Sequence, residues 1–467
     1  MPVRAPIAPV APVGEAFALG DERGVTRRYG LLVALQEFAI WLPLPVLVLH
    51  LTDRGFDLAA IGFAFALRAV FVVLLEVPTG GLADAIGRKP VALASQAATF
   101  ASFVALLVVG GPGTLLAYGV FQGIGSALHS GALEAWYVDR LTATGEGVDL
   151  QRHLATIGVV QTAAMLAGAA LGGALPALFA GFALPWPLAG FGVALAAGLL
   201  LRLVVVALTA LLVVEPEFAG RARWPVAFQT PTIVRDGFRL VRRLPTLKWL
   251  LLAGGAMGWA LTAVETFWQP IASLTFGADP ATSGVYGALG FVLGTSGLLG
   301  SLAVMRYGDR FPGGPVALAA ATQLAKAAAM FLLAVQAGGL GVAVGLSLAY
   351  VAIAAQNAPH DALLNEAVPS ERRSVVLSIH SLVFFAGIAL GSSVLGVVAS
   401  AAGPQVAMAL AGAATAVAAG AYAGVAPARR RAGVGLAVAV CVSAAADAAD
   451  VAAVVAVGPV SEELAGD

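Results

Sequence analysis

The sequence predicts an all-α polytopic membrane protein, with twelve transmembrane helices in two six-helix bundles. Of its 467 residues, 60% are hydrophobic and only 11% are charged, and the mean hydropathy is +0.91. Soluble domains carry about 25% charged residues, so this chain has too few charges to cover a surface in water. Long apolar runs recur along the chain, and the basic residues fall almost wholly on one side of them. These observations exclude nucleic-acid binders, disordered scaffolds and ordinary cytosolic enzymes.

The spans follow from the apolar runs, because a helix needs about 20 mostly apolar residues to cross a bilayer. In the first half the runs are 30–51, 57–80, 90–111, 113–138, 154–181 and 185–213. In the second half they are 247–276, 282–305, 315–336, 339–364, 373–400 and 404–426. Several runs exceed the required length, which predicts helices that tilt or project beyond the membrane.

The positions of Lys and Arg predict that both termini are cytoplasmic. With the N-terminus inside, 22 of the 26 basic residues fall in inside segments, three fall within spans, and Arg54 alone falls in an outside loop. Such an excess on the inside is the rule for membrane proteins, and missing one span would destroy it. The preference for Arg over Lys and the high Ala, Gly and Val content suggest a GC-rich bacterial genome. We therefore expect a multi-pass protein of the bacterial cytoplasmic membrane.

Five segments are expected: an N-terminal tail (1–29), a bundle (30–213), a cytoplasmic linker (214–246), a second bundle (247–426) and a C-terminal tail (427–467). The first tail lacks the apolar run of a signal peptide. The single cysteine, Cys441, leaves no intramolecular disulfide.

Two segments leave alternatives open. Residues 235–243 place four arginines at near-helical spacing, which fits an amphipathic helix on the inner leaflet or a plain basic linker. Residues 432–458 are apolar enough to suggest a thirteenth span. Asp447 and Asp450 would then lie near mid-membrane, at about 2.5–3.5 kcal/mol each, so a loosely ordered tail is the expectation.

The two halves repeat one another, as in many transporters. Span one contains Glu37, Trp41 and Pro43, and span seven contains Glu265, Trp268 and Pro270. Span five contains Gly168-Ala-Ala-Leu-Gly172-Gly173, and span eleven contains Gly387-Ile-Ala-Leu-Gly391-Ser392. Gly131-Ala-Leu-Glu134 in span four corresponds to Asp361-Ala-Leu-Leu364 in span ten. Three matched pairs in the same order indicate a duplicated six-helix unit.

The loop between spans two and three reads Gly80-Gly81-Leu82-Ala83-Asp84-Ala85-Ile86-Gly87-Arg88-Lys89. It resembles the signature loop of the major facilitator superfamily, G-x-L-a-D-R/K-x-G-R-R/K, except that Ala85 replaces a basic residue. A degenerate second copy follows span eight, as Gly300-Ser-Leu-Ala-Val304 and Gly308-Asp309-Arg310. The resemblance covers about residues 29–426 and implies the major facilitator fold. It also implies that Gly80, Asp84, Gly87, Arg88 and Lys89 form a cytoplasmic gating loop, with Asp84 near Ser370 and Ser374.

Other segments resemble bacterial drug-efflux-like members of this superfamily. Gln122-Gly123-Ile-Gly125 is similar to a family segment whose arginine is replaced here by Gly119. Gly168, Gly172 and Gly173 are similar to an antiporter segment in which Ala169 replaces a proline, although a small-residue packing interface explains them equally well. The phrases Glu76-Val-Pro78-Thr79-Gly80 and Ser130-Gly131-Ala-Leu-Glu134 carry the same resemblance.

Ionisable side chains inside spans are expensive and are candidate functional groups. The candidates for proton coupling are Glu37, Arg68, Glu134, Glu265 and Asp361. A carboxylate held away from water can take up a proton near neutral pH, which would couple proton entry to substrate exit. The alternative is a structural ion pair, such as Glu37 with Arg68.

The candidates for the substrate cavity are Trp41, Gln122, Phe267, Trp268, Gln356 and Asn357. Ordinary packing explains the aromatic residues equally well. Lys326 is expected on a peripheral helix, where snorkelling or pairing is favoured over a transport role. His129 and His380 are expected to be core histidines with satisfied hydrogen bonds.

The sequence shows no catalytic constellation, metal site or cofactor motif. We therefore expect a monomeric secondary transporter, not an enzyme, whose partners are a small molecule, protons and the bilayer. Proton-coupled efflux of an apolar or amphipathic compound by alternating access is the favoured function. The alternatives are a metabolite or sugar importer of the same fold and a membrane sensor or scaffold that does not transport.

Overall fold

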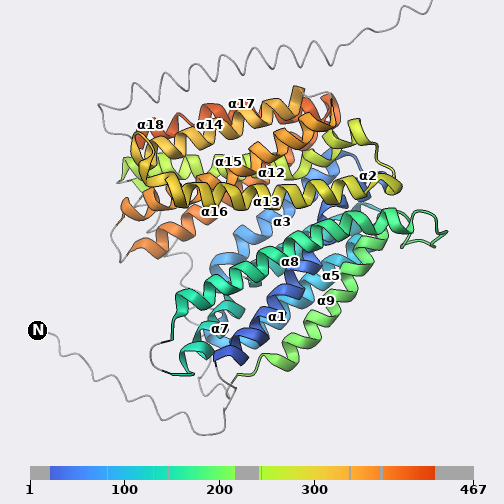
Figure 1. The fold of residues 1–467 in the computed structure, drawn as a ribbon, viewed down its shortest axis with the longest axis horizontal. Coiled ribbons are helices and arrows are strands. Elements are labelled where there is room, and N and C mark those ends of the chain that lie inside the picture. The colour runs from blue at the N-terminus through green and yellow to red at the C-terminus, as the bar shows by residue number, and fades with distance from the viewer. Residues whose placement is uncertain are drawn as a thin grey trace, which may run out of the picture.

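The computed structural model describes residues 22–80, 82–129, 131–145, 148–215, 241–242, 244–335, 338–368 and 372–425. Within these ranges every regular element is a helix, as expected where a bilayer offers no partners to unpaired backbone groups. Figure 1 shows the helices as two bundles lying side by side, with the first half of the chain in one and the second half in the other.

The N-terminal bundle contains the helices up to Leu212. They are α1 (Glu22–Trp41), η2 (Leu44–Val46), α2 (Leu47–Asp53), α3 (Leu58–Gly80), α4 (Leu82–Ile86), α5 (Arg88–Leu107), α6 (Pro112–His129), α7 (Ala132–Thr142), α8 (Leu150–Phe179) and α9 (Gly192–Leu212). The first span is broken after Trp41, where Pro43 and Pro45 lack the N–H groups that a continuous helix needs.

The C-terminal bundle begins at Pro245. Its elements are α12 (Pro245–Phe276), η3 (Pro280–Thr282), α13 (Gly284–Tyr307), η4 (Gly308–Arg310), α14 (Gly314–Val335), α15 (Gly339–Glu366), α16 (Arg373–Ala402), α17 (Pro404–Ala418) and α18 (Ala421–Val425). The buried core of this bundle is rich in Ala, Leu and Val and includes Phe267, Trp268 and Tyr286.

Eleven helices of the described chain are long and apolar enough to cross a membrane. The fourth predicted span, 113–138, is present as α6 followed by α7 and is the one missing from these eleven. The chain turns at Gly131, whose φ of 86° is open to glycine but strained for other residues. The prediction of an all-α membrane protein built from two six-helix bundles is otherwise confirmed.

The sixth span begins later than predicted. We expected a helix from residue 185, but α9 begins at Gly192. Residues 180–191 form turns instead, because Pro185 and Pro187 lack backbone N–H donors and Gly181 is a poor helix former.

The repeated glycine segments perform the same packing in both bundles. In α8, a Cβ at Gly168 would lie 2.8 Å from the carbonyl oxygen of Phe38, in the first span. In α16, a Cβ at Gly387 would lie 2.0 Å from the carbonyl oxygen of Gly255 in α12. The fifth and eleventh spans thus press on the first and seventh spans without intervening side chains. This equivalence supports the duplication inferred from the sequence.

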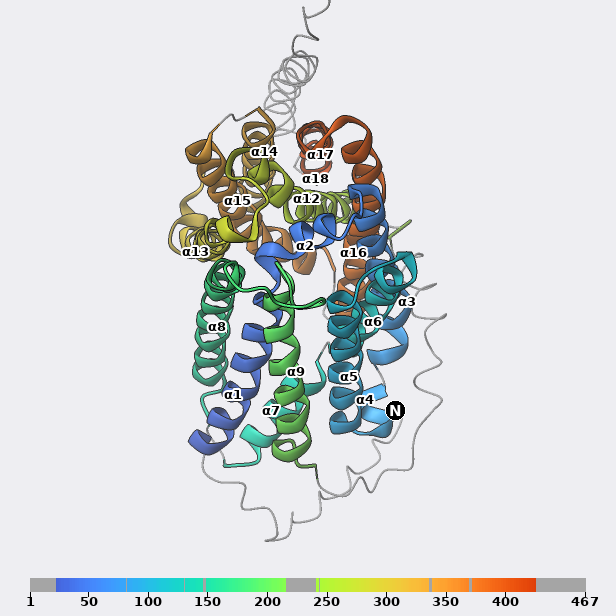
Figure 2. The same ribbon diagram turned by 90° about the vertical axis from the view of Figure 1, so that its right-hand side faces the viewer.

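The two bundles are hydrogen-bonded together at one end of the molecule, the end that faces the viewer in Figure 2. Gln269 of α12 accepts a hydrogen bond from the backbone N–H of Val48, at 2.9 Å, and donates one to the carbonyl of Leu44, at 2.9 Å. Ser283 donates to the carbonyl of Gly173 at 2.7 Å. We call this the closed end.

Several expectations lie outside the described residues. These are the two terminal tails beyond 22–425, the amphipathic segment 235–243 apart from residues 241–242, and the thirteenth span at 432–458.

Candidate transport cavity

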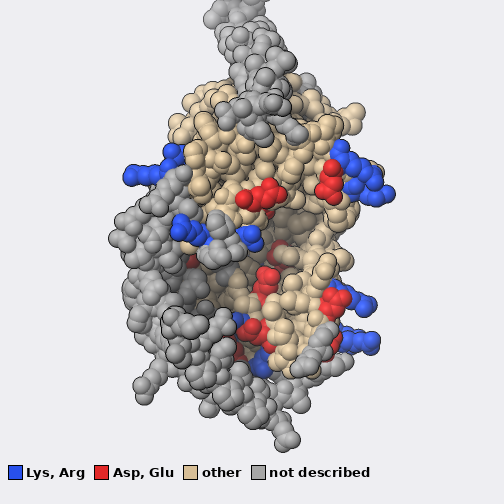
Figure 3. Space-filling view, turned by 90° about the vertical axis from the view of Figure 1, so that its left-hand side faces the viewer, with Lys and Arg blue, Asp and Glu red and all other residues tan. Residues whose placement is uncertain are grey.

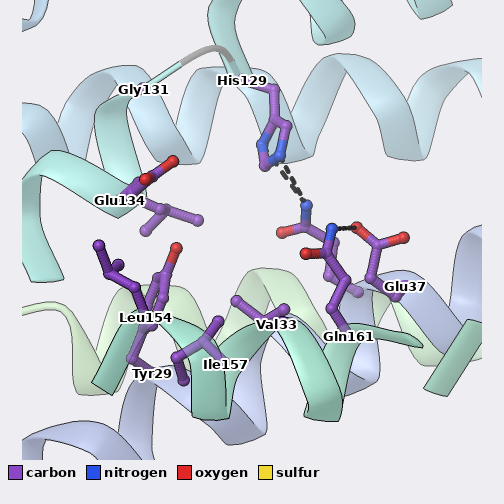
Figure 4. A pocket seen from close by; sticks show the side chains of 12 residues that line it. Tyr29, Val33, Glu37, His129, Gly131, Glu134, Leu154, Ile157 and Gln161 are labelled. Carbon is purple, nitrogen blue, oxygen red and sulfur yellow. Dashed lines mark hydrogen bonds between the residues drawn. The ribbon is translucent and has the colours of Figure 1, made fainter. Parts of the chain in front are cut away.

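The opposite end of the molecule, where α1 and α8 begin, is hollow. Figure 3 looks onto this end and shows acidic side chains on the walls of the hollow. A cavity of about 370 Å³ lies among α1, α6, α7 and α8 of the N-terminal bundle (Figure 4). Its lining residues are Tyr29, Val33, Gln36, Glu37, His129, Gly131, Leu133, Glu134, Leu154, Ile157, Gly158 and Gln161. Two of the carboxylates predicted from the sequence, Glu37 and Glu134, therefore face one cavity.

The break between α6 and α7 shapes this cavity. His129 ends α6 and Glu134 lies in the first turn of α7, on either side of Gly131. A straight helix through this segment would carry the two side chains on different faces, since five residues correspond to about 500° of rotation. The turn at Gly131 lets both of them line the same space, as Figure 4 shows.

Glu37 has a hydrogen-bond partner on the facing helix. Gln161 of α8 donates to its Oε1 at 3.0 Å. The alternative of an ion pair with Arg68 is not observed, because the two ion pairs among the described side chains are Arg88 with Asp139 and His153 with Glu22. Glu37 is thus held by a neutral amide and is in no ion pair with the described side chains.

A buried arginine stands behind the cavity wall. Arg202 of α9 is 1% exposed and donates from Nη1 to Gln96 Oε1 at 3.0 Å. Gln96 donates to Gln36 Oε1 at 2.7 Å, and Gln36 Nε2 lies 3.1 Å from a ring nitrogen of His129. Since arginine only donates, each amide of this chain must accept on one side and donate on the other. The chain therefore ends by donating to His129 on the cavity wall.

Gln122 lies beside this chain and not on the large cavity. It helps to line a separate space of about 50 Å³, together with Arg202, Gln96 and His129. Its Oε1 accepts a hydrogen bond from Ser102 of α5 at 2.7 Å.

Glu265 and Arg68 lie in opposite bundles, within electrostatic reach of each other. Glu265 has an exposed side chain in α12, although its neighbours Val264 and Thr266 are buried. The charge of Arg68 in α3 acts on Glu265, and both groups act on Tyr118 of α6. Glu265 therefore points towards the N-terminal bundle and not towards lipid.

The remaining candidates in the C-terminal bundle occupy different surroundings. Phe267 and Trp268 are 1% and 4% exposed and belong to the hydrophobic core, where they pack instead of lining the cavity described above. Gln356 is fully buried and bonded to Lys326. Asp361 and Asn357 are exposed on α15. In the N-terminal bundle, Trp41 is half-buried where α1 meets α8.

Lys326 and the two histidines of this bundle share one network. Lys326 donates to Gln356, whose amide donates to Tyr422, and Tyr422 lies 2.8 Å from His360. His360 in turn lies 3.1 Å from His380 of α16. Lys326 therefore does not snorkel to a membrane surface, because its amine is held inside the bundle.

The segment predicted as a gating loop runs from the end of α3 at Gly80, through α4, to the start of α5. Gly87 has a φ of 99° and precedes α5, whose first N–H groups, at Arg88 and Lys89, donate to the Glu215 carboxylate at 2.7 and 3.0 Å. Arg88 Nη1 lies 2.5 Å from Asp139 Oδ2 of α7. These contacts join α5, α7 and the end of α9 within one bundle.

Asp84 lies in α4, but its side chain is outside the described part of the structure, as are those of Ser370 and Ser374. The contact between bundles that the family resemblance implies for Asp84 stays a prediction.

The glycines of the antiporter-like segment lie at helix crossings. A Cβ at Gly168 would lie 2.8 Å from the carbonyl oxygen of Phe38, and one at Gly173 would lie 2.2 Å from the backbone nitrogen of Gly287 in α13. These distances support the packing interpretation of the segment, because any side chain here would separate the helices.

Sequence reasoning missed the glutamines that organise these sites: Gln36, Gln96, Gln161, Gln269 and Gln323. All lie inside apolar spans, where an amide needs a partner, and this was the available signal. The described residues contain no cluster of His, Cys, Asp or Glu that would hold a metal ion.

Comparisons with known proteins agree with this architecture. A family model described as the Major Facilitator Superfamily matches residues 29–358. No curated protein matches the chain. A structure of the nucleoside transporter NupG is 17% identical with a TM-score of 0.70, and the match covers 85% of this chain and 98% of that one.

Two other solved structures are similar at comparable identity. A bacterial homolog of the human lysosomal transporter Spinster, in an inward-facing and unoccupied conformation, is 17% identical with a TM-score of 0.60 and covers 92% of this chain and 96% of its own. A POT family transporter in complex with 5-aminolevulinic acid is 12% identical with a TM-score of 0.63 and covers 85% and 94%. Because the family model spans well over half of the sequence and the fold agrees, this chain belongs to the Major Facilitator Superfamily of membrane transporters.

Proposed function

We propose that the protein is a secondary active transporter that exports a small amphipathic molecule in exchange for protons. It works by alternating access between its two bundles, in the cytoplasmic membrane of a bacterium, with both termini on the cytoplasmic side. The orientation rests on the bias of basic residues, which places the hollow end inside.

The observation that carries the proposal is the pairing of a closed end with a hollow end whose cavity presents carboxylates. Gln269 and Ser283 tie the bundles at one end, while Glu37 and Glu134 face the cavity nearer the other end. A transporter in its inward-open state needs such a cavity, and ionisable groups at membrane depth are expensive unless they serve a function. Glu37 lies on the cavity wall and is held there by the amide of Gln161.

Glu265 and Arg68 supply a second site for coupling. They lie on α12 and α3, in different bundles, so their mutual attraction depends on how the bundles are placed. A proton bound by Glu265 removes that attraction and weakens the hold of one bundle on the other. We expect this pair to sense the conformational state, with Glu37 nearer the substrate.

The cavity fits a small molecule with both polar and apolar surface. Its volume of about 370 Å³ lies within the range of ligand pockets. Val33, Leu154 and Ile157 form apolar patches beside Gln36, Gln161 and Glu134. The stacked rings of Tyr29 and Tyr137, 4.2 Å apart, add an aromatic surface at one side.

Import of a polar metabolite is the second candidate. The cavity wall carries more hydrogen-bonding side chains than the apolar spans suggested, namely Gln36, His129 and Gln161. The similar fold of a nucleoside transporter is compatible with this candidate. A scaffold without transport is disfavoured, because it gives no reason for carboxylates facing a cavity.

Transport assays in everted and right-side-out membrane vesicles distinguish export from import. A panel of cationic, neutral and anionic amphipathic compounds, together with nucleosides and sugars, is offered with and without an imposed pH gradient. Export predicts gradient-dependent accumulation in everted vesicles. Accumulation only in right-side-out vesicles supports import, and no accumulation of any compound by verified folded protein contradicts both.

A further inference from the structure

The C-terminal bundle holds a chain of five side chains that runs from a buried amine to a histidine near the bundle interface. Lys326 of α14 is 1% exposed, and its Nζ donates to Gln356 Oε1 at 2.5 Å. Gln356 Nε2 donates to the hydroxyl of Tyr422 at 3.1 Å. His360 lies 2.8 Å from that hydroxyl through Nδ1, and 3.1 Å from His380 Nε2 through Nε2.

The donor-only lysine fixes the bonds of Gln356, and the need of the buried Tyr422 hydroxyl for an acceptor sets the direction of the rest. A charged lysine only donates, so Gln356 accepts through its oxygen and donates through its nitrogen. Tyr422 accepts that bond and gives its own proton to His360 Nδ1. His360 then carries its proton on Nε2 and donates it to His380 Nε2. His380 accepts, which leaves its own proton on Nδ1.

A second contact fixes Gln356 independently. Its Nε2 donates to Gln323 Oε1 at 2.5 Å, and Gln323 Nε2 donates to the backbone carbonyl of Thr415 at 3.3 Å. Because a backbone carbonyl only accepts, Gln323 must present its oxygen to Gln356. The orientation of the Gln356 amide therefore follows from both of its neighbours.

No carboxylate of the described chain lies within ion-pair distance of Lys326. The titratable groups around the chain are Tyr422, the two histidines and Asp361 on the outer face of α15, whose charge acts on Tyr422. On α12 the neighbour of His380 is Gly254, where a Cβ would lie 2.6 Å from the ring. Burial without a counter-ion opposes the charged state of an amine, so Lys326 is held charged only weakly.

We propose that Lys326 and His380 form a coupled proton-binding site in which only one of the two ends is protonated. A proton taken up by His380 on Nε2 would face the Nε2 proton of His360 across 3.1 Å. The chain must then break or reverse. Reversal either leaves the Tyr422 hydroxyl without an acceptor or turns the Gln356 amide over. Turning the amide breaks its bond to Gln323 and points an N–H at Lys326, which is repulsive until the lysine has lost its own proton.

The site is placed to report on the bundle interface. The residue after His380, Ser381, donates from Oγ to Glu76 Oε1 of α3 at 2.7 Å, across the two bundles. A new positive charge on His380 lies one residue from this contact. Protonation in the C-terminal bundle therefore reaches the α3–α16 packing on which alternating access depends. This role in transport rests on the proposed function, whereas proton binding itself does not.

The N-terminal bundle supplies an internal contrast. Its chain, from Arg202 through Gln96 and Gln36 to His129, has the same direction. Arginine stays protonated at all working pH values, so that chain is fixed, whereas lysine can lose its charge. Only the C-terminal chain can therefore be switched.

The proposal is tested by the ring-nitrogen NMR spectra of purified protein carrying ¹⁵N-histidine, recorded against pH without any substrate. Of the five histidines, the three that the test uses are assigned with His129→Gln, His360→Gln and His380→Gln. The expected spectrum near pH 8 has the proton of His360 on Nε2 and that of His380 on Nδ1. The opposite tautomers would overturn the proposal.

Three variants then distinguish coupling through the hydrogen-bond chain from simple charge repulsion between Lys326 and His380. Tyr422→Phe keeps the charge of Lys326 but cuts the chain, so both histidines should become mixtures of tautomers. Lys326→Arg should keep the wild-type tautomers, and Lys326→Gln should let His380 take up its proton at a pH about one unit higher.

Unchanged tautomers in Tyr422→Phe, with His129 signals showing a folded N-terminal bundle, would overturn the coupling. If Lys326→Gln does not fold, Tyr422→Phe and Lys326→Arg still test the coupling. Because the readout needs no transport, failure of the proposed export leaves this result interpretable.

Discussion

The side-chain oxygen of Gln269 accepts a hydrogen bond from the backbone N–H of Val48, at 2.9 Å, across the interface between the two bundles. Gln269 is 2% exposed, and its nitrogen also donates to the carbonyl of Leu44. The broken first span makes this possible, because the turn before η2 leaves backbone groups without helical partners. At the closed end, the Gln269 amide therefore replaces backbone bonds lost at the break, and Ser283 adds a further bond between the bundles.

We expect Gln269→Leu to open this end. Each lost hydrogen bond is worth about 0.5–1.5 kcal/mol, so removing the two bonds at 2.9 Å shifts the equilibrium by about 1–3 kcal/mol, or roughly 5- to 150-fold, towards the outward-open state. Spin labels at Thr52 and Ala278, with Cys441 replaced by serine, report the separation by pulsed electron resonance. Gln405→Leu, a change at the same end on α17, is the control. An unchanged distance distribution in Gln269→Leu would show that other contacts hold the closed end.

The cavity carboxylates are tested by neutral replacement. We expect Glu37→Gln or Glu265→Gln to flatten the pH dependence of transport, because a glutamine cannot take up the coupling proton. Glu366→Gln, an exposed change at the end of α15, is the matched control and should transport like the wild type. The measurement is the initial rate of transport into vesicles between about pH 6 and pH 8, a range roughly centred on the unperturbed titration of histidine. Transport with unchanged pH dependence in both variants would place coupling elsewhere, for example in the Lys326–His380 chain.

The sequence predicted the spans and the bundles because both depend on runs of apolar residues, which are local. It also predicted Glu37 and Glu134, since a charge inside a span stands out against its neighbours. It did not predict the turn at Gly131, because a glycine at a helix break looks like a glycine at a helix crossing. The partners of the carboxylates were also missed: Gln161 meets Glu37 only once α8 lies against α1.

The surroundings of the aromatic residues could not be predicted from the sequence either. Phe267 and Trp268 are flanked by the polar residues Thr266 and Gln269, and only the rotation of α12 decides whether they face a cavity or the core. That rotation is set by packing against α13 and by the hydrogen bonds of Gln269, which are contacts far apart in sequence.

Two glycines of α8 offer a matched pair for stability. We expect Gly172→Ala to lower the midpoint of thermal unfolding, because its Cβ would lie 1.8 Å from the carbonyl oxygen of Leu42. Overpacking of this kind costs about 1–3 kcal/mol. Gly158→Ala, in the same helix, has no atom within 4 Å of its Cβ and should be stabilising by about 0.5–1 kcal/mol. Unfolding in detergent measures both, and equal effects of the two changes would refute the packing role of Gly172.

The last prediction concerns Arg202, whose burial is costly. Its Nε and Nη2 have no hydrogen-bond partner among the described residues, and its guanidinium lies 5.4 Å from the ring of Phe103. Replacing buried ion pairs by apolar groups of similar size is often stabilising by about 1–4 kcal/mol, and the two unpartnered nitrogens of Arg202 make its burial comparably costly. We set this gain above the single bond lost to Gln96. We therefore expect Arg202→Met to raise the midpoint of thermal unfolding.

The same variant should lose transport. Without Arg202 nothing fixes the amide of Gln96, so Gln36 no longer has to donate to His129, and the cavity wall loses its defined polarity. Arg202→Lys keeps a donor and should retain more activity than Arg202→Met. A variant Arg202→Met that is both less stable and no less active than Arg202→Lys would contradict this account. If Arg202 lowers stability and yet supports transport, it behaves as expected of a residue that is kept for its function.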